Sequence, residues 1–242
     1  TNKKVVIFGA NSEIALAFVK EIISFKPKLI FISRNTDDLE RNQKNLCDKY
    51  QDLADIKIVS SPLNSLDSVV ATAKDLDEID LVFCAAGMLS PQGFCEENLV
   101  AVEQLMYSNY LIPAYFISLI KKKINRGGTI IGISSIAGER GRKQNYFYGA
   151  AKSAFTNFLS GLRQELSSQD INVLTVIPGF VKTKMISDLQ TPKILTTSSS
   201  KLAKTIIKAT GRRKAVLYPG ISLVVYYIVK LLPEFVFKKL NF

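Results

Sequence analysis

The chain has 242 residues, 47% of them hydrophobic and 22% charged, a length and composition that fit one large α/β domain and exclude disordered and collagen-like chains. It contains no histidine, which excludes Ser-His-Asp hydrolysis, Cys-His proteolysis and histidine-ligated metal chemistry. The formal net charge of +11 is uneven: residues 1–181 carry 20 basic and 19 acidic side chains, whereas residues 182–242 carry 12 and 2, which indicates an anionic partner such as nucleic acid, acidic lipid or a phosphate-bearing substrate.

Short apolar runs alternate with longer amphipathic stretches along most of the chain. Such runs, continuous rather than alternating in polarity, are typical of parallel strands buried on both faces. We therefore predict a doubly wound parallel α/β sheet that forms a single domain over residues 1–242. The predicted strands are residues 4–8, 29–32, 56–59, 81–84, 129–133 and 172–177, and the predicted helices are residues 12–24, 36–50, 65–76, 96–107, 111–124 and 148–167.

The first predicted strand ends in Gly9 and leads directly into a helix. Such a turn places backbone amides and the positive end of the helix against a phosphate group. The segment does not match G-x-G-x-x-G, and an ordinary turn capped by Ser12 is the alternative interpretation. The candidate phosphate-binding residues are Gly9, Asn11, Ser12, Glu13 and Ile14.

The second strand ends at Ser33 and Arg34, a position that contacts the adenosine ribose in dinucleotide-binding sheets. An acidic residue here would bind the free hydroxyl group of NAD, whereas Arg34 can pair with the 2′-phosphate of NADP. A merely solvated arginine is the alternative. We expect NADP(H) to be preferred over NAD(H).

The strongest signal combines Ser135, at the end of a strand, with Tyr148 and Lys152 on one helix. Residues four apart share a helix face. An ammonium group beside a phenol favours the phenolate and lowers its pKa, which suits proton transfer to or from a carbonyl oxygen. Tyr146 is a weaker candidate because Ala150 stands four residues after it.

These motifs resemble the short-chain dehydrogenase/reductase family over nearly the whole chain. The resemblance implies a Rossmann sheet, a nicotinamide cofactor and hydride transfer at a carbonyl carbon. It makes Tyr148 the acid/base, Lys152 its partner on the nicotinamide ribose, Ser135 the hydrogen-bond partner of the substrate oxygen, and Asn109 the anchor of a water-linked proton relay. It also implies cofactor contacts from Ala85, Ala86, Gly87, Pro178, Gly179, Val181 and Thr183, the last at the carboxamide.

Some family positions differ in this chain. Where the family has T-G-x-x-x-G-x-G, the sequence has Phe8, Gly9, Glu13 and Ala15, so that only the first glycine is kept. Cys84 and Ala85 replace the two asparagines of Asn-Asn-Ala-Gly, and the adenine-binding aspartate position corresponds to Pro62. The phosphate and adenine contacts are therefore the part of the predicted site that the family resemblance defines least.

Residues 9–14, 134–140 and 233–240 are similar to those of a narrower group, the reductases that act on a polyprenylphosphoryl 2-keto-pentose in the synthesis of cell-envelope glycan precursors. This similarity implies a lipid-linked keto-sugar substrate. A soluble ketone or 3-oxoacyl reductase is the alternative, and a nucleotide-binding module without turnover is a third. Arg140, Arg142 and Lys143 are candidates to hold a substrate phosphate, with a solvated loop as the alternative.

The C-terminal quarter adds two expectations. Residues 187–200, rich in Ser and Thr, indicate a mobile loop or short helices, which we interpret as a substrate-covering flap. Residues 187–242 are expected to form this flap and a basic, apolar extension of the same domain. The apolar segment 221–232 is too short to span a membrane and is flanked by basic residues. It lies either in a membrane interface or against the sheet or a sister subunit as ordinary core.

The remaining expectations concern location and partners. Cys47, Cys84 and Cys95 form neither a disulfide framework nor a zinc motif, and residues 1–9 do not resemble a signal peptide. We expect a cytoplasmic protein, at the inner face of the membrane if the extension binds lipid, and a homo-oligomer. We expect no metal and no nucleic acid, because apolar residues fill the basic segment where base-reading elements belong.

Overall fold

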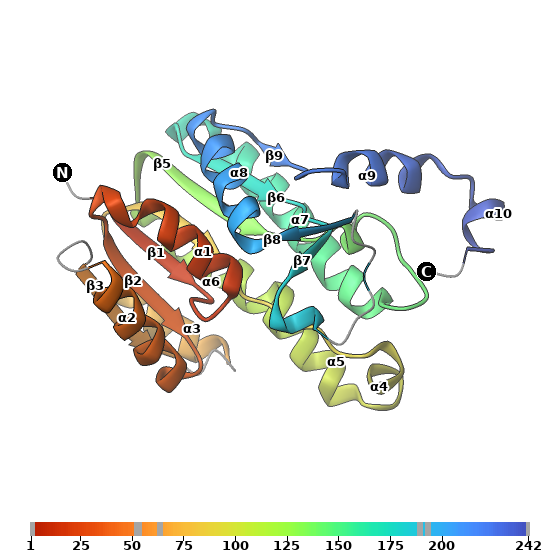
Figure 1. The fold of residues 1–242 in the computed structure, drawn as a ribbon, viewed down its shortest axis with the longest axis horizontal. Helices are drawn as coiled ribbons and strands as arrows, with labels where there is room; N and C mark the ends of the chain where they lie inside the picture. Colours follow the sequence, from red (N-terminus) through yellow and green to blue (C-terminus); the bar gives the residue numbers. More distant parts are fainter. Residues whose placement is uncertain (1–2, 51–54, 62–64, 188–190, 192–194, 241–242) are drawn as a thin grey trace.

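The computed structural model describes residues 3–50, 55–61, 65–187, 191 and 195–240, and its centre is a seven-stranded sheet in the order β3-β2-β1-β4-β5-β6-β9 (Figure 1). Every neighbouring pair in this sheet is parallel. The predicted doubly wound α/β fold is confirmed. The strands are β1 (Lys4–Phe8), β2 (Lys28–Ser33), β3 (Asp55–Ser60), β4 (Ile79–Cys84), β5 (Ile124–Ile133), β6 (Asn172–Val176) and β9 (Val216–Leu217), with a separate pair β7 (Phe180–Lys182) and β8 (Thr196–Ser198).

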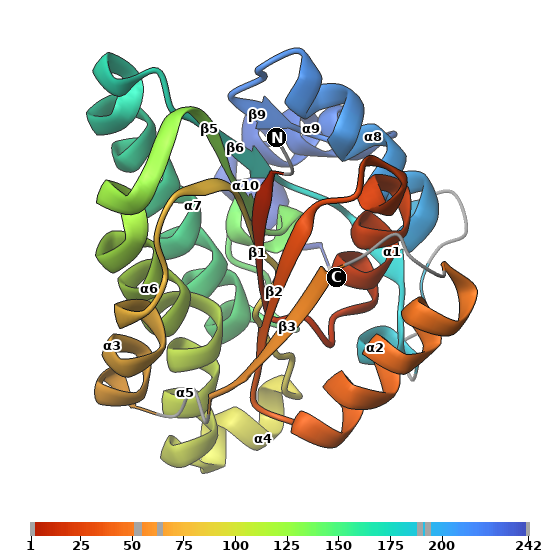
Figure 2. The same ribbon diagram turned by 90° about the vertical axis from the view of Figure 1, so that its left-hand side faces the viewer.

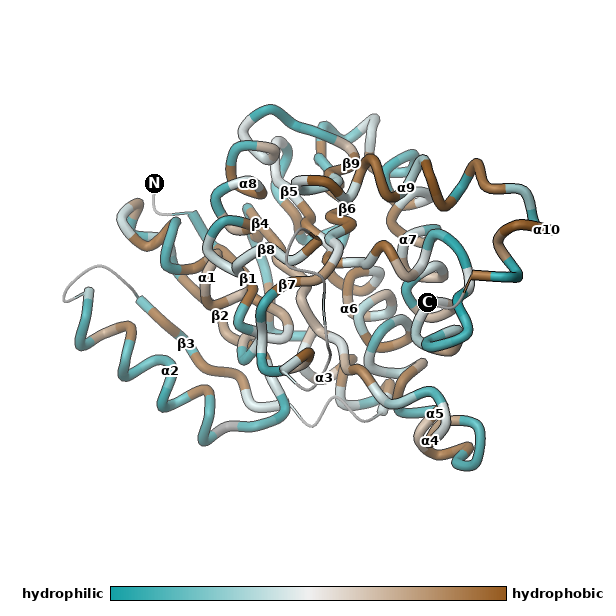
Figure 3. The backbone as a smooth tube through the Cα atoms, turned by 45° about the vertical axis from the view of Figure 1, so that its right-hand side comes forward, coloured by the Kyte–Doolittle hydropathy of each residue, from teal (hydrophilic) through white to brown (hydrophobic). Residues whose placement is uncertain are grey.

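Helices cover both faces of the sheet, with α1, α2 and α8 on one side and α3, α6 and α7 on the other (Figure 2). The outer helix α2 is mostly hydrophilic, in contrast to α9 (Figure 3). The helices are α1 (Glu13–Ile22), α2 (Thr36–Lys49), α3 (Leu66–Lys74), α4 (Gln92–Glu97), α5 (Leu99–Met106), α6 (Ile112–Ile120), α7 (Tyr146–Leu166), α8 (Ser199–Gly211), α9 (Ser222–Leu231) and α10 (Glu234–Phe237). Short turns include η2 (Tyr107–Leu111), η4 (Ile136–Gly138) and η6 (Lys184–Ile186).

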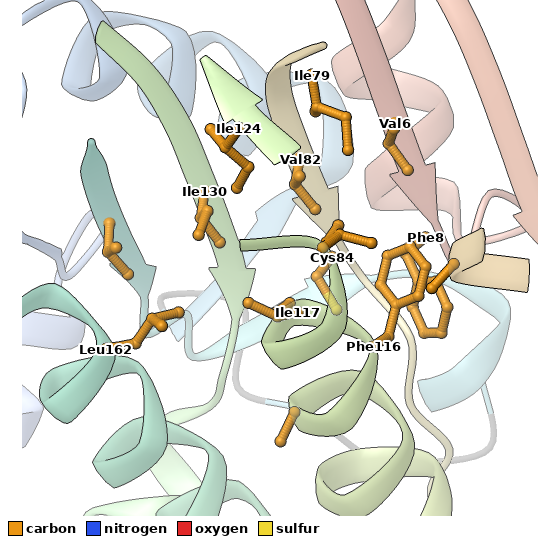
Figure 4. Close-up of a cluster of buried hydrophobic side chains, with 14 of the residues drawn as sticks. Val6, Phe8, Ile79, Val82, Cys84, Phe116, Ile117, Ile124, Ile130 and Leu162 are labelled. Atoms are coloured by element: carbon orange, nitrogen blue, oxygen red, sulfur yellow. The ribbon is translucent and has the colours of Figure 1, made fainter. Parts of the chain in front are cut away.

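The hydrophobic core has two parts because the sheet is buried on both faces. On the side of α6 and α7, the rings of Phe8 and Phe116 stack with centroids 4.2 Å apart, beside Val82 and Cys84 (Figure 4). On the other side, Phe18 stacks on Phe83 at 4.3 Å. The continuous apolar strands of the sequence therefore supply both layers, as expected of a parallel sheet.

Polar caps fix several helix starts. The side chain of Asn35 accepts a hydrogen bond from the amide of Asp38 at the start of α2, and Ser65 does the same for Ser68 at α3. Asn98 caps α5 through the amide of Ala101. Because Asn98 has an extended backbone, it also interrupts the single helix predicted for residues 96–107, which is in fact α4 followed by α5.

One further expectation needs correction. Strand β5 begins at Ile124, five residues before the predicted start. Its register with β4 shifts between Ile79 and Leu81, and the glycine-rich sequence at this irregularity lacks the apolar pattern by which a strand is predicted. The segment 187–200, predicted to be a loop or short helices that form a flap, contains β8 and the first residues of α8. The rest of that segment lies largely outside the described residues, as does Pro62.

The apolar segment predicted at 221–232 forms helix α9. It is not packed as core within this chain: Ser222 and Val229 are its buried residues, while Leu231 is 75% exposed. In the part of the chain that the structure describes, no helix is both long enough and apolar enough to cross a membrane.

Candidate active site

The predicted site residues gather at the carboxyl ends of β1, β2, β4, β5 and β6, where two adjoining cavities share Ser12, Gly87 and Thr183 in their walls. This edge is where open parallel sheets bind ligands. The first cavity, here the catalytic cavity, is lined among others by Ser12, Ile14, Ala85, Ala86, Gly87, Asn109, Ser135, Tyr148, Lys152, Pro178, Gly179, Val181 and Thr183. The second, here the nucleotide cleft, is lined among others by Gly9, Asn11, Glu13, Ser33 and Arg34.

Ser135, Tyr148 and Lys152 meet because η4 packs closely on α7. A Cβ atom at Gly149 would lie 2.7 Å from the carbonyl oxygen of Ala137, so that only glycine permits this approach. Ser135 caps η4, and its hydroxyl group hydrogen-bonds the phenol of Tyr148. The Nζ of Lys152 lies 5.9 Å from the centroid of the Tyr148 ring.

Burial governs the protonation of these groups. It raises the pKa of Tyr148 to about 12, and the hydrogen bond from Ser135 acts in the opposite direction. The sequence-based expectation that Lys152 lowers the pKa of Tyr148 does not match this balance, because desolvation of the buried phenol is the larger influence and the opposing one comes from Ser135. At neutral pH Tyr148 is a neutral phenol, ready to donate a proton.

Lys152 is deeply buried, with 4% of its surface exposed, and its Nζ donates to the carbonyl oxygen of Ile133 at 3.1 Å. Burial lowers the pKa of this lysine to about 8. Cys84, also buried, lies close enough to the lysine to influence it, and burial raises the pKa of the Cys84 thiol to about 12. The thiol is therefore neutral, and the lysine is a cationic group of the cavity.

Asn109 lies fully buried on η2, a π-helical turn, an irregularity frequent at functional sites. Its Nδ2 donates to the carbonyl oxygens of Met88 at 2.8 Å and Leu105 at 2.9 Å, and its Oδ1 accepts from the amide of Met88 at 3.3 Å. These bonds fix the loop after β4 against α5 and η2. The side chain is thereby held at the wall of the catalytic cavity.

The nucleotide cleft begins at Gly9, whose φ of +81° favours glycine. A Cβ atom there would lie 2.6 Å from the backbone nitrogen of Ala86. Because Gly9 has no side chain, the nucleotide cleft stays open at the start of α1. Ser12 precedes α1, and the helix begins with Glu13. This arrangement fits the diphosphate of a dinucleotide even without the second and third family glycines.

Asn11 and Glu13 also have structural partners. The Nδ2 of Asn11 donates to Ser33 Oγ at 3.1 Å and to the carbonyl oxygen of Asn35 at 2.9 Å, which ties the first turn to the end of β2. The carboxylate of Glu13 accepts from the amide of Lys184 at 2.5 Å, across the cleft. Arg34 is exposed beside this turn and lines the cleft.

The three cations predicted to hold a substrate phosphate have separate positions. Arg142 lines the catalytic cavity, and burial lowers its pKa. Arg140 instead binds the C-terminal segment through the carbonyl oxygens of Val229 and Leu232, each at 2.6 Å. Lys143 is exposed and belongs to neither cavity wall.

Sequence reasoning missed some of the cavity wall. Met185 and Ile186 of η6 line the catalytic cavity just before the segment predicted as a flap, and Asn145 lies beside Arg142. The signal available for Met185 and Ile186 was their apolar character shortly after Thr183. Tyr146, the rejected candidate, is outside the catalytic cavity and donates to Glu96 at 2.7 Å.

Comparison with known proteins agrees with this geometry. Residues 3–193 match the family model described as short chain dehydrogenase. The chain is 25% identical over 246 residues to the uncharacterized oxidoreductase Rv2073c of Mycobacterium tuberculosis, covering 98% of this chain and 96% of that one. It is 26% identical to the ketoacyl reductase HetN of a Nostoc strain, covering 86% and 75%.

Solved structures show the same fold. A short-chain dehydrogenase from Sphingobium yanoikuyae in complex with NADPH superposes with a TM-score of 0.80 at 20% identity, covering 93% of this chain and 91% of that one. A bulky-bulky ketone specific alcohol dehydrogenase from Comamonas testosteroni gives 0.78 at 18% identity, covering 96% and 95%.

Proposed function

The chain belongs to the short-chain dehydrogenase family, and on that premise we propose that this NAD(P)-dependent oxidoreductase reduces the keto carbon of a 2-keto-pentose carried on a polyprenyl phosphate. The observation that carries the proposal is one cavity whose wall contains Ser135, Tyr148 and Lys152 together with Arg142. The first three residues serve carbonyl reduction. The arginine favours a substrate that bears an anionic group.

The proton in this reduction comes from Tyr148. Its phenol is neutral at physiological pH because burial raises its pKa to about 12, so it can donate to the oxygen of the reacting carbonyl group. Ser135 hydrogen-bonds the phenol and would also bind the oxygen of the reacting carbonyl group. Lys152, cationic below its pKa of about 8, stabilises the phenolate left after donation. A nicotinamide cofactor bound in the cleft would supply the hydride.

The nucleotide cleft supports NADPH as the cofactor. Gly9 and the start of α1 would hold the diphosphate, and Arg34 would face the 2′-phosphate at the end of β2. The exposed guanidinium group lines the cleft, where an acidic residue would repel that phosphate. The cation therefore favours NADPH over NADH.

Arg142 supports a phosphate-bearing substrate because a half-buried guanidinium group gains from an anionic partner. The apolar cavity wall around it, with Leu89, Phe180 and Met185, suits the non-polar part of a lipid-linked sugar. A soluble ketone or 3-oxoacyl reductase is the second candidate. The names of two similar proteins, a ketoacyl reductase and a bulky-ketone dehydrogenase, favour it.

The test is cofactor oxidation by the purified protein with NADPH and NADH, given a polyprenylphosphoryl 2-keto-pentose, a soluble bulky ketone or a 3-oxoacyl thioester. We expect the lipid-linked sugar to be reduced most efficiently. We also expect Arg142→Gln to raise KM for that substrate by about tenfold or more, as the loss of a charged hydrogen bond predicts, and to affect the soluble ketone much less.

Lys143→Gln is the matched control because Lys143 is adjacent in sequence, exposed and outside the cavity wall. It should leave KM unchanged. Efficient turnover of only the soluble ketone or the thioester would transfer the proposal to the second candidate. Absence of turnover with all three substrates would contradict both.

A further inference from the structure

Helix α9 presents an apolar face to the outside of the protein. Val224, Tyr227, Ile228 and Leu231, here called the α9 stripe, follow the i, i+3, i+4, i+7 spacing of one helix face and are 53%, 54%, 56% and 75% exposed. The opposite face carries the buried residues Ser222 and Val229. A helix that meets only water has its polar side chains outward, so the α9 stripe indicates a non-aqueous neighbour.

The apolar surface continues beyond the stripe and has a basic border. Phe235, 65% exposed, follows α9 on the short helix α10, and Leu240 is 40% exposed. Lys238 and Lys239 are exposed next to them, and Lys230 lies within α9 itself. Figure 1 shows α9 and α10 projecting beyond the sheet, and Figure 3 shows their predominantly hydrophobic character.

This surface is firmly attached to the protein. Arg140 donates to two carbonyl oxygens at the end of α9, pairs with Glu234 at 2.6 Å and stacks on the ring of Phe237 at 3.8 Å. At the other end of α9, the hydroxyl group of Ser222 accepts from the amide of Gly179 at 2.9 Å. The exposed stripe is therefore held in one orientation rather than carried on a frayed tail.

We propose that the α9 stripe and its basic border dock on an anionic lipid bilayer. A helix of ten residues is about 15 Å long, half the roughly 30 Å of the hydrocarbon layer, so it lies along the interface instead of crossing it. Apolar side chains enter the boundary between headgroups and acyl chains. The lysines meet the anionic headgroups, and the two contributions add.

Charge favours lipid over a second copy of the chain. Residues 212–242 carry six basic side chains and one acidic one, Glu234, whose carboxylate is paired with Arg140. A two-fold dimer through the α9 stripe would place the same basic border against itself, because a two-fold interface joins identical patches. An anionic bilayer presents the opposite charge over the whole surface.

Docking would also bring the catalytic cavity close to the membrane. Gly179, which Ser222 holds, lines that cavity, and Arg142, two residues after Arg140, lies in its wall. This consequence rests on the proposed function, since a lipid-linked substrate would then reach the cavity from the bilayer. Lipid binding itself needs no turnover and is measured separately.

The experiment is sedimentation of the purified full chain with vesicles of phosphatidylcholine alone or with about one-third phosphatidylglycerol, an anionic content that attracts basic surfaces. We expect binding to the anionic vesicles. Ile228→Asp/Leu231→Asp should weaken it by about tenfold or more, because two buried apolar contacts are lost and two negative charges approach the headgroups. Lys238→Gln/Lys239→Gln should weaken binding to anionic vesicles and leave the weak binding to neutral ones unchanged.

Matched controls separate location from general charge. Phe25→Asp changes an equally exposed apolar residue, 76% exposed, outside the surface, and Lys201→Gln/Lys204→Gln removes two exposed charges from α8. Both should bind like the wild type. Thermal unfolding and NADPH oxidation with a soluble ketone should match the wild type for every variant, which shows that each one folds.

Three results would overturn the proposal: wild-type protein that stays in the supernatant, stripe variants that sediment as the wild type does, or controls that lose binding equally. A wild-type dimer that becomes monomeric in Ile228→Asp/Leu231→Asp, without vesicle binding by either form, would assign the α9 stripe to a second copy instead. Failure of the keto-sugar assay with intact vesicle binding would contradict the proposed substrate alone.

Discussion

Burial of Lys152 makes the free energy of unfolding depend on pH, and a single substitution separates this contribution from those of other titrating groups. The side chain is 4% exposed, and burial lowers its pKa to about 8, whereas a lysine in an unfolded chain keeps its proton to about pH 10.4. Replacing it with methionine keeps most of the side-chain shape and removes the titrating group. The comparison of wild type with Lys152→Met therefore reports this one titration.

The sign follows from proton counting. Between about pH 8 and pH 10.4 the unfolded lysine is protonated and the folded one is not, so the unfolded state binds more protons and the free energy of unfolding rises with pH. One pKa unit is worth about 1.4 kcal/mol, and the shift spans roughly two units up to pH 10, which gives about 2 to 3 kcal/mol. Tyr148 titrates in the opposite sense, above about pH 10, because its pKa is raised to about 12.

Urea unfolding at several pH values from 7 to 10 measures the effect, with Lys122→Met as a control at an exposed lysine. The free energy of unfolding of the wild type, minus that of Lys152→Met, should increase by about 2 to 3 kcal/mol as the pH rises. A difference that stays flat, or that shifts toward the variant, would refute the assignment of a buried, destabilised ammonium group.

Three further predictions concern the backbone, the cofactor and the C-terminal segment. Gly9→Ala should destabilise the fold by about 2 kcal/mol or more and weaken NADPH binding, because the φ of Gly9 is +81° and the new Cβ atom would clash with the backbone. The control Gly161→Ala, which has open space around it, should change neither the free energy of unfolding measured by chemical denaturation nor the Kd measured by NADPH titration. Arg34→Ala should raise the Kd for NADPH at least about tenfold and that for NADH little, since a charged phosphate contact is lost; equal effects would remove the 2′-phosphate role, and Lys44→Ala is the control. Arg140→Ala should expose residues 229–240 to limited proteolysis while the unfolding midpoint of the sheet changes little, and unchanged cleavage would contradict the anchoring role.

The strands and most of the site residues could be predicted because their signals are local. Each strand that enters the sheet centre is a run of apolar residues, and the site residues follow those runs at the strand ends. Strands β7, β8 and β9 have two or three residues each, too few to give a pattern. Interruption of the helix at Asn98 depends on one capping side chain, a weak signal within an otherwise helical sequence.

Long-range contacts account for the rest. The hydrogen-bond partners of Arg140 lie 89 to 94 residues away in the chain, so nothing near it in the sequence shows that it holds the C-terminal segment rather than a substrate. The pKa of Tyr148 depends on how deeply the fold buries it, which the Tyr-Lys spacing does not reveal. The exposure of α9 likewise depends on which elements pack against it, because an apolar segment of this length is compatible with both core and surface.

The most direct test of the reductase assignment is the rate of NADPH oxidation by Tyr148→Phe with a reducible ketone, measured beside NADPH binding by the same protein. Removing the hydroxyl group takes away the proton donor and leaves the ring in place, so turnover should fall by about a hundredfold or more, while the Kd for NADPH changes little. A variant that turns over at a rate close to that of the wild type would contradict the assignment of Tyr148 as the proton donor.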